Sequence, residues 1–139
     1  IVALNTLLSY SQMALPINFE EGQVTTESFV DFNGGNGTVV DNPFITDDNS
    51  SNTVGKIVRD GGDIWAGSYL TISPLDFTTE TTIKMSVYSV SPGLLVKFKL
   101  EDDNDPVTAA VERDAYTTKY NQWETLTWSF SGEQSNIPI

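Results

Sequence analysis

Cysteine and histidine are both absent from the 139 residues of the chain. The absence of thiols excludes a disulfide framework, a cysteine nucleophile, a zinc ribbon and an iron–sulfur cluster. The absence of imidazole excludes Ser-His and Cys-His nucleophilic sites, a histidine general base and most transition-metal sites. Any chemistry must therefore use carboxylates, hydroxyl groups, lysine or tyrosine.

Basic residues are also scarce, with 7 Lys and Arg against 19 Asp and Glu and a formal net charge of -12. Such a surface repels nucleic acid and anionic lipid. Hydrophobic residues make up 39% of the chain and aromatic residues 11%, so the acidity is not that of a disordered segment. After the first residues, no apolar run approaches the roughly 18 residues of a membrane-spanning helix. We expect a folded acidic module with no nucleic-acid partner and no membrane insertion.

Helical periodicity is missing after residue 15, and alternation of apolar and polar residues takes its place. It is clearest in three segments: 82–88, 95–100 and 125–130. In the third segment the alternation places Trp128 on the apolar face, in the core. Weaker candidates are 17–20, 28–32, 38–40, 54–59, 68–72 and 107–113. About nine short strands spaced by about 8 to 12 residues predict an all-β fold, an antiparallel jelly-roll β-sandwich.

Both ends of the chain have unusual features. Residues 1–8 are apolar and uncharged, and small residues follow at Ser9 and Ser11, as before a signal-peptidase site. We therefore interpret residues 1–14 as a partial signal peptide or leader, although a disordered leader or a linker also fits. Residues 15–139 form the expected module. We expect it to be secreted or at the cell surface and to be truncated before its last strand.

Four segments carry a resemblance to a known family: 15–20, 64–68, 96–101 and 121–132. They resemble a β-sandwich carbohydrate-binding module, similar in fold to galactose-binding-like modules. Such modules lie beside laminarinase-type glycoside hydrolases and in surface glycan-binding proteins of polysaccharide-degrading bacteria. The resemblance implies non-catalytic binding of a polysaccharide, either a β-glucan such as laminarin or another marine glycan such as alginate. Binding would keep an attached enzyme or a cell surface close to the polysaccharide.

Two tryptophans are candidates for stacking on the C–H face of a sugar ring. Trp65 follows a glycine-containing turn at 60–63, where a loop would present the ring to solvent. Trp123 is out of phase with the apolar positions of 125–130, so we expect it to face away from their core or to cap that core at the start of the strand. The alternative for both is packing beneath a loop, because large aromatic side chains are mostly buried.

Three lysines form a second candidate surface. Lys84, Lys97 and Lys99 point outward on two strands, and Tyr88 shares the phase of Lys84. If the two strands are adjacent, these residues form one face that bonds sugar hydroxyls or an anionic glycan. The alternative is a solvated face that pairs with Asp and Glu.

A structural calcium ion is implied by the resemblance, with Glu20 and Glu21 as ligands at the end of the first expected strand. Calcium prefers such hard oxygen ligands. In this family the final strand often supplies another ligand. The acidic segment 101–105 lacks the glycine and distal glutamate of an EF-hand loop, so we interpret it as a hairpin turn. Residues 41–52, the longest polar segment, are expected to form a surface loop.

Two other functions stay open. One is a structural or adhesive β-sandwich without affinity for sugar. The other is a fragment of a glycoside hydrolase, which needs only two suitably spaced carboxylates. No single expected strand carries a cluster of carboxylates, so we favour a protein that is not an enzyme.

Overall fold

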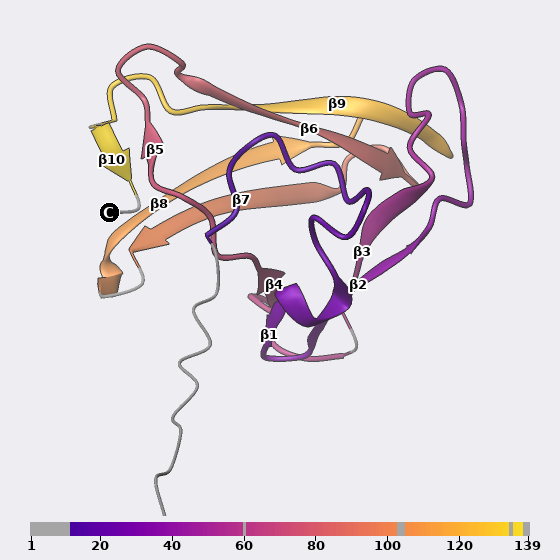
Figure 1. Cartoon of the computed structure of the whole chain (residues 1–139), viewed down its shortest axis with the longest axis horizontal. Helices are drawn as coiled ribbons and strands as arrows, with labels where there is room; N and C mark the ends of the chain where they lie inside the picture. Colours follow the sequence, from indigo (N-terminus) through magenta and orange to yellow (C-terminus); the bar gives the residue numbers. More distant parts are fainter. Residues whose placement is uncertain (1–11, 60, 103–104, 134, 138–139) are drawn as a thin grey trace, which may run out of the picture. The chain divides into compact units, whose positions relative to one another are not determined.

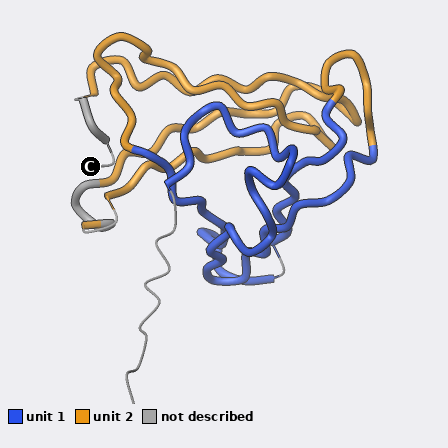
Figure 2. Tube along the Cα trace, in the orientation of Figure 1, with its two compact units in different colours: residues 1–43, 51–73 blue, residues 44–50, 74–139 orange. Residues whose placement is uncertain are grey.

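The computed structural model describes residues 12–59, 61–102, 105–133 and 135–137. The chain forms two compact units, with residues 1–43 and 51–73 in unit 1 and residues 44–50 and 74–139 in unit 2 (Figure 2). Within the described residues, the helical content is one 3-10 turn, η1 (Thr26–Ser28), and no helix is long and apolar enough to cross a membrane. Residues 1–11 of the expected leader lie outside the described residues.

Unit 1 contains two antiparallel ladders (Figure 1). Its strands are β1 (Val30–Phe32), β2 (Gly35–Asp41), β3 (Thr53–Arg59) and β4 (Gly67–Tyr69). β2 pairs with β3 in continuous register, and β1 pairs with β4. Met13 also joins this unit, because its carbonyl accepts a hydrogen bond from the Ser73 N–H at 2.8 Å.

Glycines let two phenylalanine rings lie directly on the β2–β3 ladder. A Cβ atom at Gly37 would come within 2.5 Å of the Phe29 ring, and one at Gly55 within 2.7 Å of the Phe19 ring. The two rings stack on each other with their centroids 6.3 Å apart. The missing side chains at these two positions therefore make room for an aromatic pair that covers the ladder.

Unit 2 contains the strands that alternate most clearly in the sequence. They are β5 (Leu75–Asp76), β6 (Thr82–Ser89), β7 (Leu95–Asp102), β8 (Asp105–Tyr116), β9 (Gln122–Ser129) and β10 (Ser135–Ile137). β6 pairs with β9, β7 with β8, and β5 with β10, all antiparallel. Asp102 pairs with Asp105 at the end of the β7–β8 ladder, and residues 103–104 of the predicted acidic hairpin turn lie outside the described residues.

The core of unit 2 lies between the β6–β9 and β7–β8 ladders, which pack face to face (Figure 1). Trp128 is 1% exposed, and its ring centroid lies 5.3 Å from that of Phe98. Its indole N–H donates to the Val96 carbonyl at 3.2 Å, so the buried polar atom has a partner. Phe130 is also fully buried, and its ring stacks on that of Phe77. The predicted core position of Trp128 is confirmed.

The fold class agrees with the sequence, while several details differ. The all-β class with antiparallel sheets is confirmed, and the jelly-roll connectivity stays a prediction. The strand expected at 17–20 is absent, because Phe19 and Glu21 adopt positive φ angles of 60° and 53°, which interrupt an extended chain. The strand expected at 68–72 ends early, at Tyr69.

Candidate functional site

The structure brings together two of the six residues proposed from the sequence to bind the ligand. Tyr88 and Trp123 are direct neighbours in the β6–β9 register, on the face of the ladder opposite to Trp128. Their ring centroids lie 5.5 Å apart in an edge-on arrangement. Antiparallel partners place their side chains close together, which explains the contact between residues far apart in the chain.

A third ring, Phe44, completes an aromatic cluster of Phe44, Tyr88 and Trp123. Phe44 follows β2 in the chain and belongs to unit 2. Its ring stacks on that of Tyr88 with centroids 4.0 Å apart and planes inclined by 6°. The indole N–H of Trp123 donates to the Phe44 carbonyl at 2.7 Å. Phe44 is therefore fixed both through its ring and through its backbone.

Exposure separates the roles of these rings. Trp123 is 7% exposed, because the loop that carries Phe44 covers it. Its position off the core face of β9 agrees with the sequence phase, yet the ring is packed beneath a loop, which is the alternative left open. Phe44 is 46% exposed and presents its ring to solvent. Trp123 thus packs beneath the Phe44 loop, and Phe44 is the ring of the pair that faces solvent.

The aromatic cluster borders a hollow of about 320 Å³. The other lining residues are Ile45, Thr46, Asp48, Asn121 and Gln122. They add one hydroxyl group, one carboxylate and two amides to the rings. An apolar surface beside a few polar groups is the usual composition of a site for a small polar ligand.

Two local structures hold the polar side of this hollow. Thr46 and Asn49 exchange backbone hydrogen bonds of 3.1 Å in both directions, which closes the turn that contains Asp48. Asn121 has a φ angle of 49°, a left-handed conformation that asparagine tolerates better than most residues. These constraints fix the backbone on the polar side of the hollow, so a group bound there would require little further ordering of the chain.

Beside Asn121, the buried carboxylate of Glu124 fixes the turn that precedes β9. It accepts hydrogen bonds from the Ser89 hydroxyl, the Thr118 N–H and hydroxyl, and the Lys119 N–H. The bond from Ser89 is the largest cause that lowers the pKa of Glu124 from 4.5 to about 2, and the bonds from Thr118 and Lys119 add to it. The ionised form is therefore the one that the fold stabilises.

Acid should weaken the fold through this carboxylate. Because the pKa of Glu124 is lower in the folded state than in the unfolded state, its stabilising effect is complete above pH 4.5. The effect should be lost as the pH falls through about 2. Urea unfolding followed from pH 7 to about pH 2 should show this loss in the wild type and a smaller one in Glu124→Gln. The exposed Glu80→Gln is the matched control, and parallel losses in all three proteins would contradict the role of Glu124.

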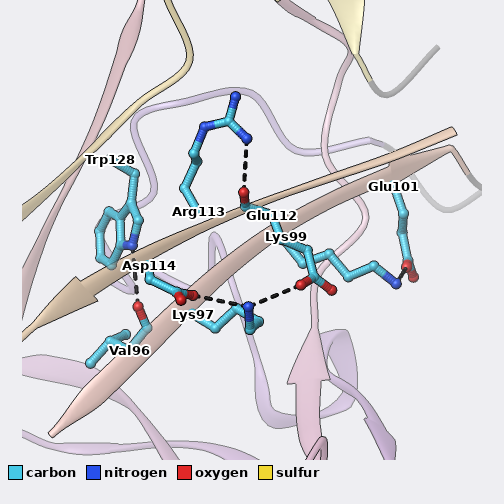
Figure 3. A network of polar contacts seen from close by, with 8 residues as sticks. All are labelled: Val96, Lys97, Lys99, Glu101, Glu112, Arg113, Asp114 and Trp128. Atoms are coloured by element: carbon cyan, nitrogen blue, oxygen red, sulfur yellow. Dashed lines mark hydrogen bonds and ion pairs between the residues drawn. The ribbon is translucent and has the colours of Figure 1, made fainter.

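The three lysines proposed as one face lie on two different ladders. Lys84 is on β6, which pairs with β9, whereas Lys97 and Lys99 are on β7, which pairs with β8. The Lys97 ammonium lies 2.9 Å from both Glu112 and Asp114 (Figure 3). The hydrogen bonds that the Lys97 ammonium donates to these carboxylates raise its pKa, first that to Asp114 and then that to Glu112.

Lys99 is ion-paired as well, with Glu101 of the same strand (Figure 3). The outward face of β7 thus carries lysines that are paired with carboxylates and exposed to solvent, the alternative that the sequence left open. The condition for a single lysine face is not met, because β6 and β7 belong to separate two-stranded ladders, β6–β9 and β7–β8.

Trp65 lies in unit 1 and is 60% exposed, as expected for a loop that follows a glycine turn. The guanidinium of Arg59 donates to the carbonyls of Asp63 and Ile64 at 3.1 and 2.9 Å. A turn bond from the Ala66 N–H to the Asp63 carbonyl closes the same loop. The indole is therefore presented to solvent on a backbone with defined partners.

Glu20 clamps the start of β3. Its carboxylate accepts the Asn52 N–H at 2.6 Å and the Thr53 N–H at 3.1 Å. These bonds, first that from Thr53, lower the pKa of Glu20. The neighbouring Glu21 is exposed. Within the part of the chain that the structure describes, no three acidic side chains are grouped to hold a metal ion, so calcium at Glu20 and Glu21 stays a prediction.

Sequence reasoning missed Phe44, because it lies in the segment 41–52, which was interpreted as a polar surface loop. The available signal was the apolar triplet Pro43-Phe44-Ile45 inside that segment.

Comparisons of the chain with models of protein families, with curated proteins and with solved structures give no match.

Proposed function

We propose that this chain is a non-catalytic module that binds polysaccharide, with Phe44 as the ring on which a sugar stacks. The observation that carries the proposal is the half-exposed Phe44 ring, fixed on Tyr88 beside a hollow with hydroxyl, amide and carboxylate groups. The resemblance stated above adds to it.

The physical chemistry of sugar binding favours this arrangement. A pyranose presents C–H groups on its faces and hydroxyl groups around its edge, so it matches an aromatic face with a polar border. Because Phe44 is already held by Tyr88 and by the Trp123 indole, little conformational freedom is lost on binding.

The hollow favours binding over hydrolysis. Glycoside hydrolases generally use two carboxylates roughly 5 to 9.5 Å apart. Asp48 is the one carboxylate among the described residues that line this hollow. We therefore propose a binding function without catalysis, for a module that is secreted or at the cell surface and attached to an enzyme or a surface.

Two further features belong to the same proposal. Trp65 provides a second exposed ring, in unit 1, for contact with a glycan. Calcium held by Glu20 or Glu21 would be structural, as the resemblance implies, and no step of ligand binding depends on it. The competing proposal is a structural or adhesive module, which would not bind polysaccharide.

Replacing Phe44 by alanine tests the proposal. For a polysaccharide that binds the wild type, we expect the binding free energy to weaken by about 1 to 3 kcal/mol, roughly a 5- to 150-fold loss of affinity, because the stacking surface is lost. Affinity electrophoresis in gels that contain laminarin, alginate or another soluble polysaccharide measures the change.

The matched control is Phe32→Ala, which removes a partly exposed ring from β1 of unit 1. It should bind glycan as the wild type does. Circular dichroism of both variants verifies that the fold is intact. Wild-type affinity in Phe44→Ala, or no retention of the wild type by any glycan, would refute the proposal.

A further inference from the structure

The hollow beside the aromatic cluster carries negative charge and, among its described lining residues, no basic side chain. Asp48 lines it, and Asp47 precedes it in the same exposed turn. A carboxylate accepts hydrogen bonds and donates none when ionised. It therefore suits a ligand group that brings its own proton, such as a sugar hydroxyl.

The other polar groups that line the hollow are compatible with the same kind of ligand group. The Thr46 hydroxyl and the amides of Asn121 and Gln122 both donate and accept hydrogen bonds. Sugar hydroxyls do the same, so each of these groups can pair with a hydroxyl as donor or as acceptor. A uronate carboxylate accepts only, and next to Asp48 it would meet a second acceptor of the same charge.

Neither of the two nearby lysines is among the residues that line the hollow. The Lys119 ammonium donates to the Trp123 carbonyl at 3.2 Å, which holds it on the backbone at the start of β9 without neutralising its charge. Lys84 lies on the same face of β6 as Tyr88 but four residues away, which is about 13 Å along a strand. This separation exceeds the Debye length of about 8 to 10 Å at moderate salt, so screening weakens the attraction.

Charge elsewhere on the chain acts in the same direction. The formal net charge is -12, which repels a polyanion before it reaches any site. Lys97 and Lys99, which could attract such a polymer, are paired with carboxylates of β7 and β8.

We infer that this hollow selects an uncharged polysaccharide and rejects chains that carry uronic acids. The inference rests on the proposed function, because it assigns a ligand class to the same site. It decides between the two classes of glycan that the sequence left open.

The test compares a neutral β-glucan, laminarin, with alginate in affinity gels at about 20 mM and about 300 mM NaCl. The wild type should be retained by laminarin with little dependence on salt, and alginate should not retard it at either concentration. In Asp48→Lys, alginate should begin to retard the protein at low salt, at least several-fold more than it does the wild type. Asp48→Asn is the matched control, which removes the charge and keeps the size.

The outcomes separate the inference from the proposed function. Retention of the wild type by alginate that is lost in Phe44→Ala would overturn the inference while the binding function stands. Equal retardation of Asp48→Lys and the wild type by alginate at low salt would also overturn it. Retention by no polysaccharide would overturn both. Laminarin retention that depends on Phe44, with alginate binding gained only on charge reversal at Asp48, supports the inference.

Discussion

Trp128→Ala should destabilise the fold by about 3 to 5 kcal/mol, because a large ring is removed from a core that does not fully collapse. The side chain is 1% exposed and lies between the two packed ladders of unit 2, against Phe98. Its loss also leaves the Val96 carbonyl without the indole N–H. A typical domain is stable by only about 5 to 15 kcal/mol, so a large part of the total would be lost. Urea unfolding measured by near-ultraviolet circular dichroism gives the change.

Trp65→Ala is the matched control for this prediction. It removes the same kind of side chain from an exposed loop, so it should shift the free energy of unfolding by less than about 0.5 kcal/mol. Similar midpoints for Trp128→Ala and the wild type would show that the ladders of unit 2 do not depend on this ring.

The alternation of apolar and polar residues predicted the strands of unit 2 well. Each side chain of a strand faces opposite to its neighbours, so burial on one face leaves a pattern in the sequence. This pattern located β6, β7 and β9 and placed Trp128 in the core. It also placed Trp123 on the opposite face of β9, where the structure has it.

The pattern does not say which strands are neighbours. Lys84 and Lys97 have the predicted outward phase, yet their strands pair with β9 and β8 and not with each other. Alternation is a local property, whereas pairing depends on contacts between residues far apart in the chain. For the same reason the sequence could not bring Phe44 onto Tyr88, since the two are separated by β3, β4 and β5.

Short segments gave the weakest predictions. Residues 17–20 alternate over only two periods, and the left-handed backbone at Phe19 and Glu21 replaces the expected strand. The chain passes between the two units at 43/44, 50/51 and 73/74. The first two of these points lie inside the polar segment 41–52, and polar composition alone does not distinguish a loop within one unit from a passage between two.

Replacing Trp123 should affect both stability and binding. Trp123→Ala should cost about 3 to 5 kcal/mol of stability, because the ring is 7% exposed and fills the space beneath the Phe44 loop. It should also abolish measurable glycan retention, since Tyr88 loses its edge contact and Phe44 loses its backbone anchor.

Trp123→Phe separates these two effects. It keeps an aromatic ring against Tyr88 and removes the N–H that donates to the Phe44 carbonyl. The loss of one such bond costs about 0.5 to 1.5 kcal/mol, so the fold should persist. Glycan retention should nevertheless fall, because the anchor of the Phe44 backbone is gone. If Trp123→Phe binds glycan like the wild type, the indole only fills space, and the position of Phe44 is set by its stacking on Tyr88 alone.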